Sequence, residues 1–252
     1  MKALGIIPAR YHSTRFVGKP LADICGKPMI EHVYKRASMS DSLTSVTVAT
    51  DDERILRKVE GFGGRAILTA SYHKSGTDRI AEALSQLDIE DADLVVNIQG
   101  DQPLLGPETV DEVIRPLMDD PSIVMGTLSC RIKTEEDIEN PNVVKVVVDK
   151  EGFALYFSRF PIPYVRGSDT TACHYRHIGV YVYRKDFLLR FTQMPQSRLE
   201  KAEMLEQLRA LENGYRIKVV ETHYDSVDVD TPEDLNKVKR IMARGECGVF
   251  PI

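Results

Sequence analysis

Residues 3–19 have the sequence ALGIIPARYHSTRFVGK, in which an apolar run passes directly into a basic loop. The branched, apolar residues Ala3–Ile7 predict a strand. Arg10, Arg15 and Lys19 follow it with the same sign of charge, and no carboxylate interrupts the stretch. A loop that follows a strand lies at the carboxyl edge of an α/β sheet, where ligands bind. We therefore expect this loop to face an anion.

The rest of the first half alternates strand and helix patterns. Strands are expected at Val46–Ala49, Ala66–Leu68 and Leu94–Ile98, and helices at Met29–Ala37, Asp52–Val59 and Asp78–Leu87. Such alternation predicts a parallel sheet joined by right-handed crossovers. The ligand site is then expected at the carboxyl ends of the strands, where the strand order changes direction.

The pattern changes after about residue 120, where four strand patterns follow at close spacing. They cover Ile123–Cys130, Val143–Val148, Phe153–Tyr156 and Arg176–Tyr183, and the turn DKEG joins the second to the third. We expect antiparallel pairing here. The whole chain is thus expected to form one α/β domain over residues 1–252, a mixed but mainly parallel sheet flanked by helices, with a smaller antiparallel lobe over about residues 131–185.

Two helices are expected in the last quarter of the chain. The first is a long amphipathic helix over Ser197–Leu211. The second begins at DTPEDL, where Thr231 is a good N-cap, Pro232 fits the first helical position and Asp234 completes a capping box.

The composition restricts the class of partner. The 252 residues are 42% hydrophobic and carry a formal net charge of −5, so binding to nucleic acid or to a membrane surface through bulk charge is not expected. No apolar run approaches the ~20 residues that cross a bilayer, and no signal-peptide pattern is evident. Cys25, Cys130, Cys173 and Cys247 have no CxxC spacing, which indicates reduced thiols and a cytoplasmic location.

The basic loop has the composition of a phosphate site. Gly18, Ser13 and Thr14 lie among the three cations, so backbone N–H groups and charged side chains could together surround a polyphosphate. The order of residues matches neither a Walker A loop nor the GxGxxG dinucleotide motif. The competing interpretation is an ordinary solvated basic loop, and the charges alone do not decide between the two.

Two carboxylates are candidates for a magnesium site. The strand in LVVNIQGDQP, residues 94–103, ends just before Asp101, at the same edge of the sheet as the basic loop. In DSVDVDTPEDL, residues 225–235, Asp228 and Asp230 share one face of a short strand, and Asp230 ends it. Magnesium commonly takes one or two carboxylates together with phosphate oxygens and water. Taken singly, Asp101 could be a turn or cap residue, and Asp230 could simply precede the cap at Thr231.

A zinc site is not expected. Cys173, His174 and His177 have a spacing that could begin one, but no further Cys or His cluster supplies four ligands.

Taken together, these features have a known counterpart. The motifs IPARYHSTRFVGKPL, HKSGTDRIAEA, VVNIQGDQP, NPNVVKVVVD, ALYFSRFPIPY, RHIGVYVYR, EMLEQLR and VDTPEDL occur in this order over nearly the whole chain. The sequence resembles the 3-deoxy-manno-octulosonate cytidylyltransferases of Gram-negative bacteria, which have a Rossmann-like fold of the nucleotide-diphospho-sugar transferase type. It departs from them at Val17, where similar enzymes usually have proline, and we expect a tuned rather than an absent activity.

The resemblance implies a reaction for lipopolysaccharide synthesis. CTP and 3-deoxy-manno-octulosonate (Kdo) would give CMP-Kdo and pyrophosphate, with Mg²⁺ as cofactor, as the anomeric hydroxyl attacks the α-phosphate. Arg10, Arg15 and Lys19 would hold the triphosphate, and Asp101 and Asp230 would hold the metal. The predicted catalytic residues are Arg10, Arg15, Lys19 and Asp101, and the predicted nucleotide-binding residues are Ala9, Arg10, Ser13, Arg15, Lys19, Ser75, Gly76, Thr77 and Gln99. No general base stands out in the sequence.

The resemblance also implies an acceptor site in the second half. Kdo is an acidic sugar, and the Arg159 guanidinium can hold a carboxylate with two hydrogen bonds. The full set of predicted sugar-binding residues is Gln99, Arg159, His177, Tyr181, Glu206 and Gln207. How Gln99 and residues 75–77 divide between nucleotide and sugar stays open. Without the family match, Tyr181 would be assigned to the core, His177 to a structural role and Glu206 to a solvated helix face.

Alternatives remain for the function and the assembly. The same reaction could act on an 8-amino analogue of Kdo or on another acidic sugar such as sialic acid. A non-catalytic nucleotide-sensing protein on the same scaffold is a third interpretation, although such a protein could lose one metal carboxylate, and this chain has both. The resemblance further implies a homodimer, in contact through the antiparallel region.

Overall fold

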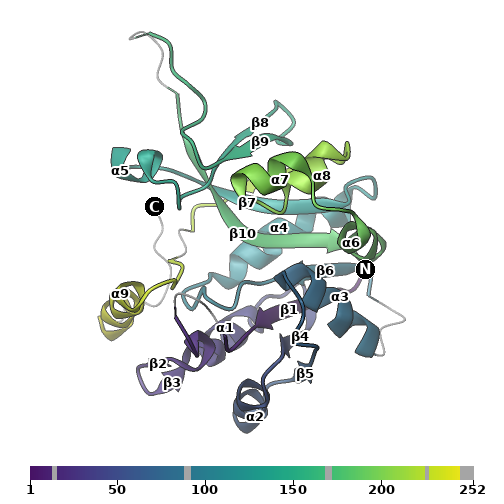
Figure 1. The fold of residues 1–252 in the computed structure, drawn as a ribbon, viewed down its shortest axis with the longest axis vertical. Helices are drawn as coiled ribbons and strands as arrows, with labels where there is room; N and C mark the ends of the chain where they lie inside the picture. Colours follow the sequence, from purple (N-terminus) through teal and green to yellow (C-terminus); the bar gives the residue numbers. More distant parts are fainter. Residues whose placement is uncertain (13–15, 88–91, 168–171, 225–226, 245–252) are drawn as a thin grey trace.

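The computed structural model describes residues 1–12, 16–87, 92–167, 172–224 and 227–244. Within these residues, one nine-stranded sheet has the order β11-β7-β10-β6-β1-β4-β5, and β8 and β9 continue from β10 (Figure 1). Helices cover both faces of this sheet. The expected α/β class, a mixed and mainly parallel sheet with an antiparallel extension, is confirmed.

The first half forms the parallel part of the sheet. Its strands are β1 (Ala3–Ala9), β4 (Leu43–Thr50), β5 (Ala66–Leu68) and β6 (Leu94–Asn97), connected by α1 (Met29–Ala37), α2 (Glu53–Gly61) and α3 (Gly76–Gln86). These elements match the expected ones to within two or three residues at each end. The chain runs from β1 outward to β4 and β5, then returns to place β6 on the other side of β1. The strand order therefore changes direction between β1 and β6, where a ligand site is expected.

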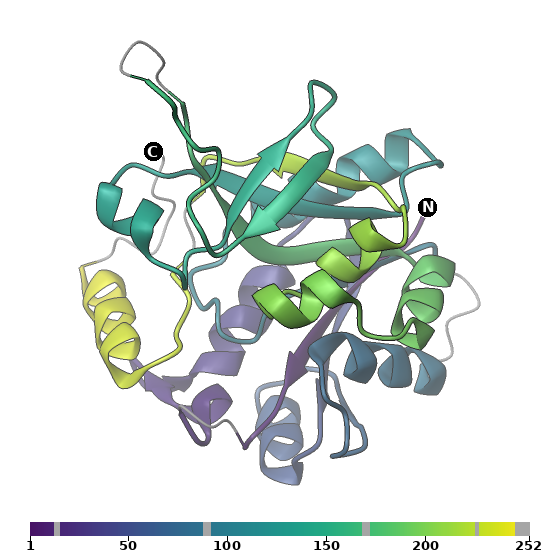
Figure 2. The same ribbon diagram turned by 45° about the horizontal axis from the view of Figure 1, so that its top comes forward.

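The second half adds the antiparallel part. β10 (Tyr175–Arg184) pairs antiparallel with both β6 and β7 (Met125–Arg131), and β11 (Ile217–Glu221) lies parallel to β7 at the edge. β8 (Lys145–Val148) and β9 (Ala154–Ser158) form an antiparallel pair that joins the sheet through β10 and projects from it (Figure 2). The first helices of this half are α4 (Pro107–Asp119), α5 (Glu135–Glu139) and α6 (Lys185–Gln193).

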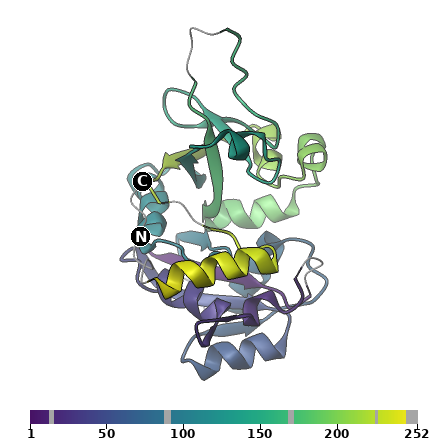
Figure 3. The same ribbon diagram turned by 90° about the vertical axis from the view of Figure 1, so that its left-hand side faces the viewer.

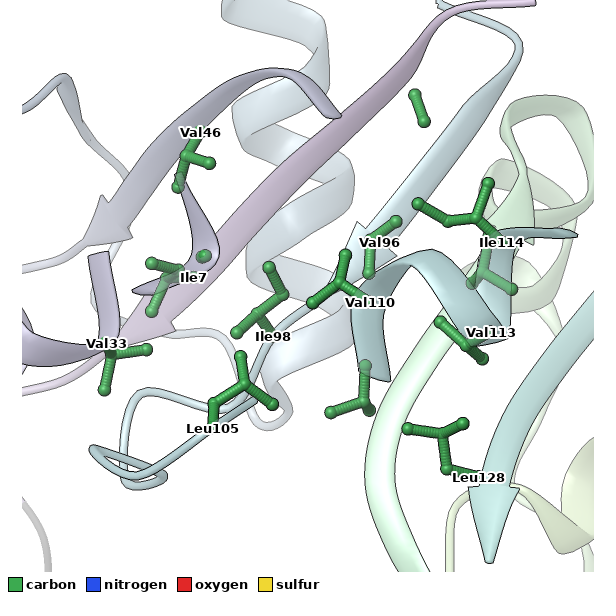
Figure 4. Packing of buried hydrophobic residues seen from close by; sticks show 14 of the residues in the cluster. Ile7, Val33, Val46, Val96, Ile98, Leu105, Val110, Val113, Ile114 and Leu128 are labelled. Atoms are coloured by element: carbon green, nitrogen blue, oxygen red, sulfur yellow. The ribbon is translucent and has the colours of Figure 1, made fainter. Parts of the chain in front are cut away.

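Two large hydrophobic clusters lie on opposite faces of the sheet. Neighbouring strand residues alternate between them, so that Ile7 belongs to one cluster and Ile6 to the other. Figure 4 shows the first cluster, in which Val33 of α1 and Val110 and Val113 of α4 pack against the strands. The second cluster joins the strands to α3 and α6. Burial on both faces explains why the central strands are almost continuously apolar.

The predicted long helix over Ser197–Leu211 is wrong. The structure has α7 (Arg198–Glu203), then Met204 in the left-handed region at φ 54°, and a separate α8 (Leu208–Glu212). The physical reason lies in a distant part of the chain, because Arg159, directly after β9, donates hydrogen bonds from its guanidinium to the carbonyls of Glu203 and Met204, at 2.7 and 3.4 Å. These bonds satisfy carbonyls that a continuing helix would have used. The break places Glu206 and Gln207 in a turn.

The C-terminal helix is as predicted. α9 (Pro232–Ala243) begins at Thr231, whose side chain forms the capping box with Asp234. α9 packs against β2 (Asp23–Ile24), which forms a small antiparallel hairpin with β3 (Lys27–Pro28) after the 3₁₀ turn η1 (Lys19–Leu21) (Figure 3). The end of the described chain thus returns to the segment that follows the basic loop. No helix in the described part is long and apolar enough to cross a membrane.

Candidate active site

A cavity of about 260 Å³ lies at the carboxyl ends of β1 and β6, at the switch in strand order. We call it the β1–β6 cavity. Eight residues singled out from the sequence line it, namely Ala9, Arg10, Lys19, Ser75, Gly76, Gln99, Asp101 and Asp230. They come from four stretches of the chain, so the fold brings together the basic loop, the start of α3, the end of β6 and the segment before α9. Ser13 and Arg15 lie outside the described residues.

Lys19 lies between the two predicted metal carboxylates. Its Nζ donates to Asp101 Oδ2 at 2.8 Å and to Asp230 Oδ1 at 3.3 Å. Gly18, at φ 74°, provides the left-handed turn that precedes Lys19, and its N–H donates to the Tyr11 carbonyl at 2.8 Å. Two carboxylates from distant parts of the chain therefore converge on one cation.

This donor set fits a hard divalent cation. The ammonium of Lys19 occupies the position between Asp101 and Asp230 to which such an ion would be attracted, and both oxygens are of the type that magnesium prefers. Within the described residues, no group of three or more His, Cys, Asp and Glu side chains is arranged to hold a metal. Phosphate oxygens and water would have to complete the coordination of any ion held here.

Asp228 is a third acidic residue beside this pair. Burial of the carboxyl group, together with repulsion from Asp101 and Asp230, raises the pKa of Asp228 to about 6, although the residue as a whole is exposed. Gln102 Nε2 donates to the Asp228 carboxylate at 2.8 Å, and this bond favours the charged form. The cation site thus carries more negative charge than two carboxylates alone supply.

The start of α3 forms the opposite wall of the cavity. Ser75 is the N-cap, and its hydroxyl accepts a hydrogen bond from the N–H of Asp78 at 3.1 Å. The N-terminus of a helix of this length carries partial positive charge and free N–H groups, which suit a polar or anionic ligand. Gly76 leaves little room there, because a Cβ at this position would lie 3.1 Å from Pro8 Cγ.

Sequence reasoning missed three residues of this wall, His73, Lys74 and Arg79. Arg79 is 3% exposed, lines the cavity, and donates to Asp51 Oδ2 at 2.9 Å and to Thr69 Oγ1 at 2.6 Å. His73 also lines the cavity, and its Nε2 bonds to the Glu82 carboxylate. All three belong to the stretch HKSGTDR. The position of Arg79 one helical turn after the N-cap Ser75 was a signal that its side chain faces the same cavity, and no such spacing points to His73 or Lys74.

On β10, the structure buries the predicted sugar residue Tyr181 and half-buries His177. His177 bonds through Nε2 to Thr127 Oγ1 at 3.0 Å and packs edge-on against Phe157, and burial lowers the pKa of His177 to about 3. Burial raises the pKa of Tyr181 well above its ordinary value. Both side chains are therefore neutral near pH 7. Gln99, which lines the cavity, connects to this strand because its Nε2 donates to the Gly179 carbonyl at 3.0 Å.

A second cavity, of about 530 Å³, lies beside α7 and α8, and we call it the α7–α8 cavity. It shares Lys74 and Ser75 with the β1–β6 cavity, and Glu206 also lines it. Thr77 donates to Glu206 Oε2, and burial raises the pKa of Glu206. Gln207 is buried, and its Nε2 has no hydrogen-bond partner among the described residues. The break between α7 and α8 thus brings Glu206 into the cavity that adjoins the β1–β6 cavity, whereas Gln207 lines neither of the two.

Arg159 lies in neither cavity lining. Its Nη1 donates to the Pro141 carbonyl at 2.9 Å, in addition to the two bonds that end α7. The structure therefore shows a capping role for this side chain, and its contact with a sugar carboxylate stays a prediction.

Comparison with known proteins identifies the family. A family model described as cytidylyltransferase matches residues 4–218. The chain is 57% identical over 241 residues to the 3-deoxy-manno-octulosonate cytidylyltransferase of Syntrophus aciditrophicus, over 96% of this chain and 97% of that protein. The protein of the same name from Geobacter sulfurreducens is 53% identical over 94% of this chain and 98% of its own length. The chain belongs to the 3-deoxy-manno-octulosonate cytidylyltransferases.

A solved structure of this family has the same fold. The structure of CMP:2-keto-3-deoxy-manno-octonic acid synthetase complexed with CTP superimposes with a TM-score of 0.92 at 44% identity, over 97% of this chain and 100% of that one. The 4-diphosphocytidyl-2C-methyl-D-erythritol synthase of Anaerococcus prevotii shares the fold alone, with a TM-score of 0.63 at 15% identity. The resemblance to the cytidylyltransferases seen in the sequence motifs is thereby confirmed.

Proposed function

We propose that this chain transfers the cytidylyl group of CTP to Kdo, giving CMP-Kdo and pyrophosphate for lipopolysaccharide synthesis. The observation that carries the proposal is the convergence of Lys19, Asp101 and Asp230 in one cavity, in a member of the 3-deoxy-manno-octulosonate cytidylyltransferases. A cation between two carboxylates, beside the start of a helix and a basic loop, is the arrangement that a nucleoside triphosphate with its metal requires.

The triphosphate end of CTP is assigned to the basic loop. Arg10 and Lys19 would bind the phosphate oxygens, and Arg15 would add a third cation from the same loop. The anomeric oxygen of Kdo forms a bond to the α-phosphorus as the bond from that phosphorus to the β-phosphate oxygen breaks, and the electron pair leaves with pyrophosphate. Lys19 and the arginines would stabilise the charge that develops on the leaving group.

Magnesium is assigned to Asp101 and Asp230. The position of the Lys19 ammonium between the two carboxylates supports this assignment, since it marks where a cation is attracted. When bound, magnesium would neutralise phosphate charge and make the attacking hydroxyl easier to deprotonate. Asp101 and Asp230 would then hold the phosphates and the acceptor oxygen in register, and Lys19 would be released to the triphosphate.

The nucleotide and the sugar are assigned to the two adjoining cavities. Ala9, Ser75, Gly76 and Gln99 line the β1–β6 cavity, which supports nucleotide contacts from these residues and from Thr77 beside them. Glu206 lines the α7–α8 cavity, and the unpartnered amide of Gln207 supports an acceptor hydroxyl nearby. His177, Tyr181 and Arg159 would shape the sugar site, and Arg159 would also meet the sugar carboxylate if the chain around it closes on the ligand.

The test is pyrophosphate release with CTP, magnesium and Kdo, in parallel with ATP and UTP, and with 8-amino-Kdo and sialic acid as acceptors. The proposal predicts release with CTP and Kdo and a large loss with the other nucleotides. If 8-amino-Kdo is turned over faster than Kdo, the acceptor is the amino sugar, and the reaction is still cytidylyl transfer. No release with any pair, while CTP still binds, would leave a nucleotide-sensing protein.

We also propose a homodimer that works in the cytoplasm, where CTP is found. β9 pairs only with β8 within the described residues, and beyond the bridge between Phe153 and Lys218 its other edge has no strand partner. Val148 and Leu155 on this pair are 42% and 63% exposed, and the nearby Phe160 is 74% exposed. An open edge strand with exposed apolar side chains is typical of an interface. The proposed contact lies within the antiparallel lobe of about residues 131–185.

A further inference from the structure

A third hydrophobic cluster, separate from the two large ones, lies beside the cation site. Its buried members are Ile24, Met29, Val229, Leu235 and Val238, and Phe16, Ala22, Leu104, Val227 and Met242 pack against it. We call this set the arm cluster, because its later members lie in the C-terminal arm, residues 227–243. None of its buried members belongs to either large cluster.

The arm cluster is built from the neighbours of the three charges of the cation site. Phe16, Ala22 and Ile24 bracket Lys19 in the sequence, and Leu104 follows Asp101 by three residues. Val229 is 0% exposed and directly precedes Asp230. Packing within this one cluster therefore fixes the backbone on both sides of Lys19 and Asp230 and on the C-terminal side of Asp101, although the charges themselves face the β1–β6 cavity.

Hydrogen bonds of the backbone also fix the position of Asp230. The Val229 N–H donates to the Asp101 carbonyl at 2.9 Å, which joins the backbones of the two carboxylate-bearing segments directly. The N–H of Asp230 donates to Asp234 Oδ2 at 3.1 Å, and the N–H of Thr231 donates to the same oxygen at 2.9 Å. Asp230 is thus held between a backbone bond to Asp101 and the cap of α9.

We propose that Val229, Leu235, Val238 and Ile24 are positioning residues of the cation site, because their packing seats the C-terminal arm and thereby sets the position of Asp230. This inference rests on the proposed function for its kinetic consequence and goes beyond it in assigning a role to α9. Seating of the arm and binding of a divalent cation are then linked equilibria. If the arm is loosened, only a fraction of the protein has the arm docked and can bind the ion. The apparent affinity of the protein for the ion therefore falls.

The location of the arm cluster separates this role from general stability. The two large clusters hold the sheet and its helices without the arm, so truncation in the arm cluster loosens residues 227–243 locally. The same truncation in a large cluster lowers the stability of the whole protein and leaves the cation site assembled.

The experiment compares Val238→Ala in α9 with the matched control Val113→Ala in α4, both at positions that are 0% exposed. The magnesium concentration for half-maximal pyrophosphate release is expected to rise about tenfold in Val238→Ala, with kcat largely recovered at saturating magnesium. In Val113→Ala this concentration stays unchanged while Tm falls. Val238→Ile is expected to restore the wild-type magnesium dependence. Leu235→Val is the milder second variant if Val238→Ala folds poorly.

Two readouts need no turnover. Mn²⁺ binding to the substrate-free protein, followed by electron paramagnetic resonance, is expected to weaken in Val238→Ala and to match the wild type in Val113→Ala. Amide hydrogen exchange is expected to rise over residues 229–243 alone. Failure of pyrophosphate release in the wild type would overturn the proposed function, while these two readouts would still decide the role of the arm. Unchanged Mn²⁺ affinity together with unchanged exchange in Val238→Ala would overturn it.

Discussion

At the scale of single residues, the positive charge of Lys19 is paired with the two carboxylates of the cation site. Its Nζ lies within hydrogen-bond distance of both Asp101 and Asp230, so the fold pairs the charges of the site internally. The three charged residues that are proposed to bind the triphosphate and the metal therefore form ion pairs with one another. Exchange of a metal ion for the ammonium would release Lys19 without leaving either carboxylate unpaired.

Asp101→Asn tests the first carboxylate. We expect kcat to fall by about 100-fold or more, because a positioned charge that acts on the reacting phosphate is lost. The free energy of unfolding should change by about 1 kcal/mol or less, since partly exposed ion pairs contribute little. Steady-state kinetics at limiting magnesium and chemical denaturation measure the two effects. Unchanged turnover at limiting magnesium would show that Asp101 does not hold the ion.

Asp228→Asn tests the electrostatic strain of the site in metal-free protein. The folded-state pKa of Asp228, about 6, lies above the ordinary value of 3.8, so this residue reduces stability as pH rises from about 4 to above 6. Removing the charge should therefore raise the free energy of unfolding at pH 7.5 by about 1 kcal/mol after solvent screening, and have no effect near pH 4. Urea denaturation at both pH values measures this. Equal effects at the two pH values would contradict the assignment.

Whether a site residue could be predicted from the sequence depends on its place relative to the strand patterns. Lys19 and Asp101 follow strand patterns, and such positions meet at one edge of a sheet, so their convergence could be predicted. The short strand expected to end at Asp230 is wrong, because residues 227–230 form no strand, and Asp230 is placed instead by the packing of the segment before α9. Arg79 and His73 depend on side-chain partners, Asp51 and Glu82, that no local pattern announces. The polar contacts of a buried wall were therefore out of reach of the sequence.

At the scale of elements, the break between α7 and α8 is the feature that the sequence pattern predicted wrongly, as one continuous helix. The apolar spacing over Ser197–Leu211 is that of one helix, but the backbone leaves the helix at Met204, which is left-handed, and becomes helical again at Leu208. Arg159, directly after β9, supplies the bonds that end α7. A tertiary contact thus overrides a local period, whereas the central strands and α1 to α3 needed no such contact and could be predicted from their own patterns.

Arg159→Met tests this junction. The substitution keeps much of the aliphatic volume and removes the donors to the carbonyls of Glu203 and Met204, so the free energy of unfolding should fall by about 1–3 kcal/mol. The turn with Glu206 and Gln207 would lose its support, and KM for the sugar should rise more than KM for CTP. Denaturation and initial rates with each substrate varied measure both effects. A rise in KM for the sugar with no loss of stability would indicate a direct sugar contact in place of capping.

At the scale of the whole molecule, one sheet carries both halves of the chemistry. The parallel half holds the basic loop and Asp101, the antiparallel half holds β10 and the turn before α8, and the C-terminal arm returns across the sheet edge to add Asp230 (Figures 1 and 3). The order of these parts along the chain could be predicted from the motifs. The return of α9 to the β2–β3 hairpin could not, because nothing in the sequence pairs two short apolar patterns about 200 residues apart.

Leu155→Asp tests the proposed dimer. A charge on the open edge of β9 should disrupt the contact, so light scattering should report half the wild-type mass. Leu189→Asp on α6, at a position that is 40% exposed, is the control and should leave the mass unchanged. A wild-type protein with the mass of one 28.4 kDa chain at micromolar concentration would contradict the proposal.

The most direct test of the account is a crystal structure of this protein with CTP and magnesium. We predict an ion coordinated by carboxylate oxygens of both Asp101 and Asp230 beside the α-phosphate, with Lys19 moved from the carboxylates to the phosphates. An ion held by the phosphates alone, with Lys19 still between the two carboxylates, would contradict the central claim.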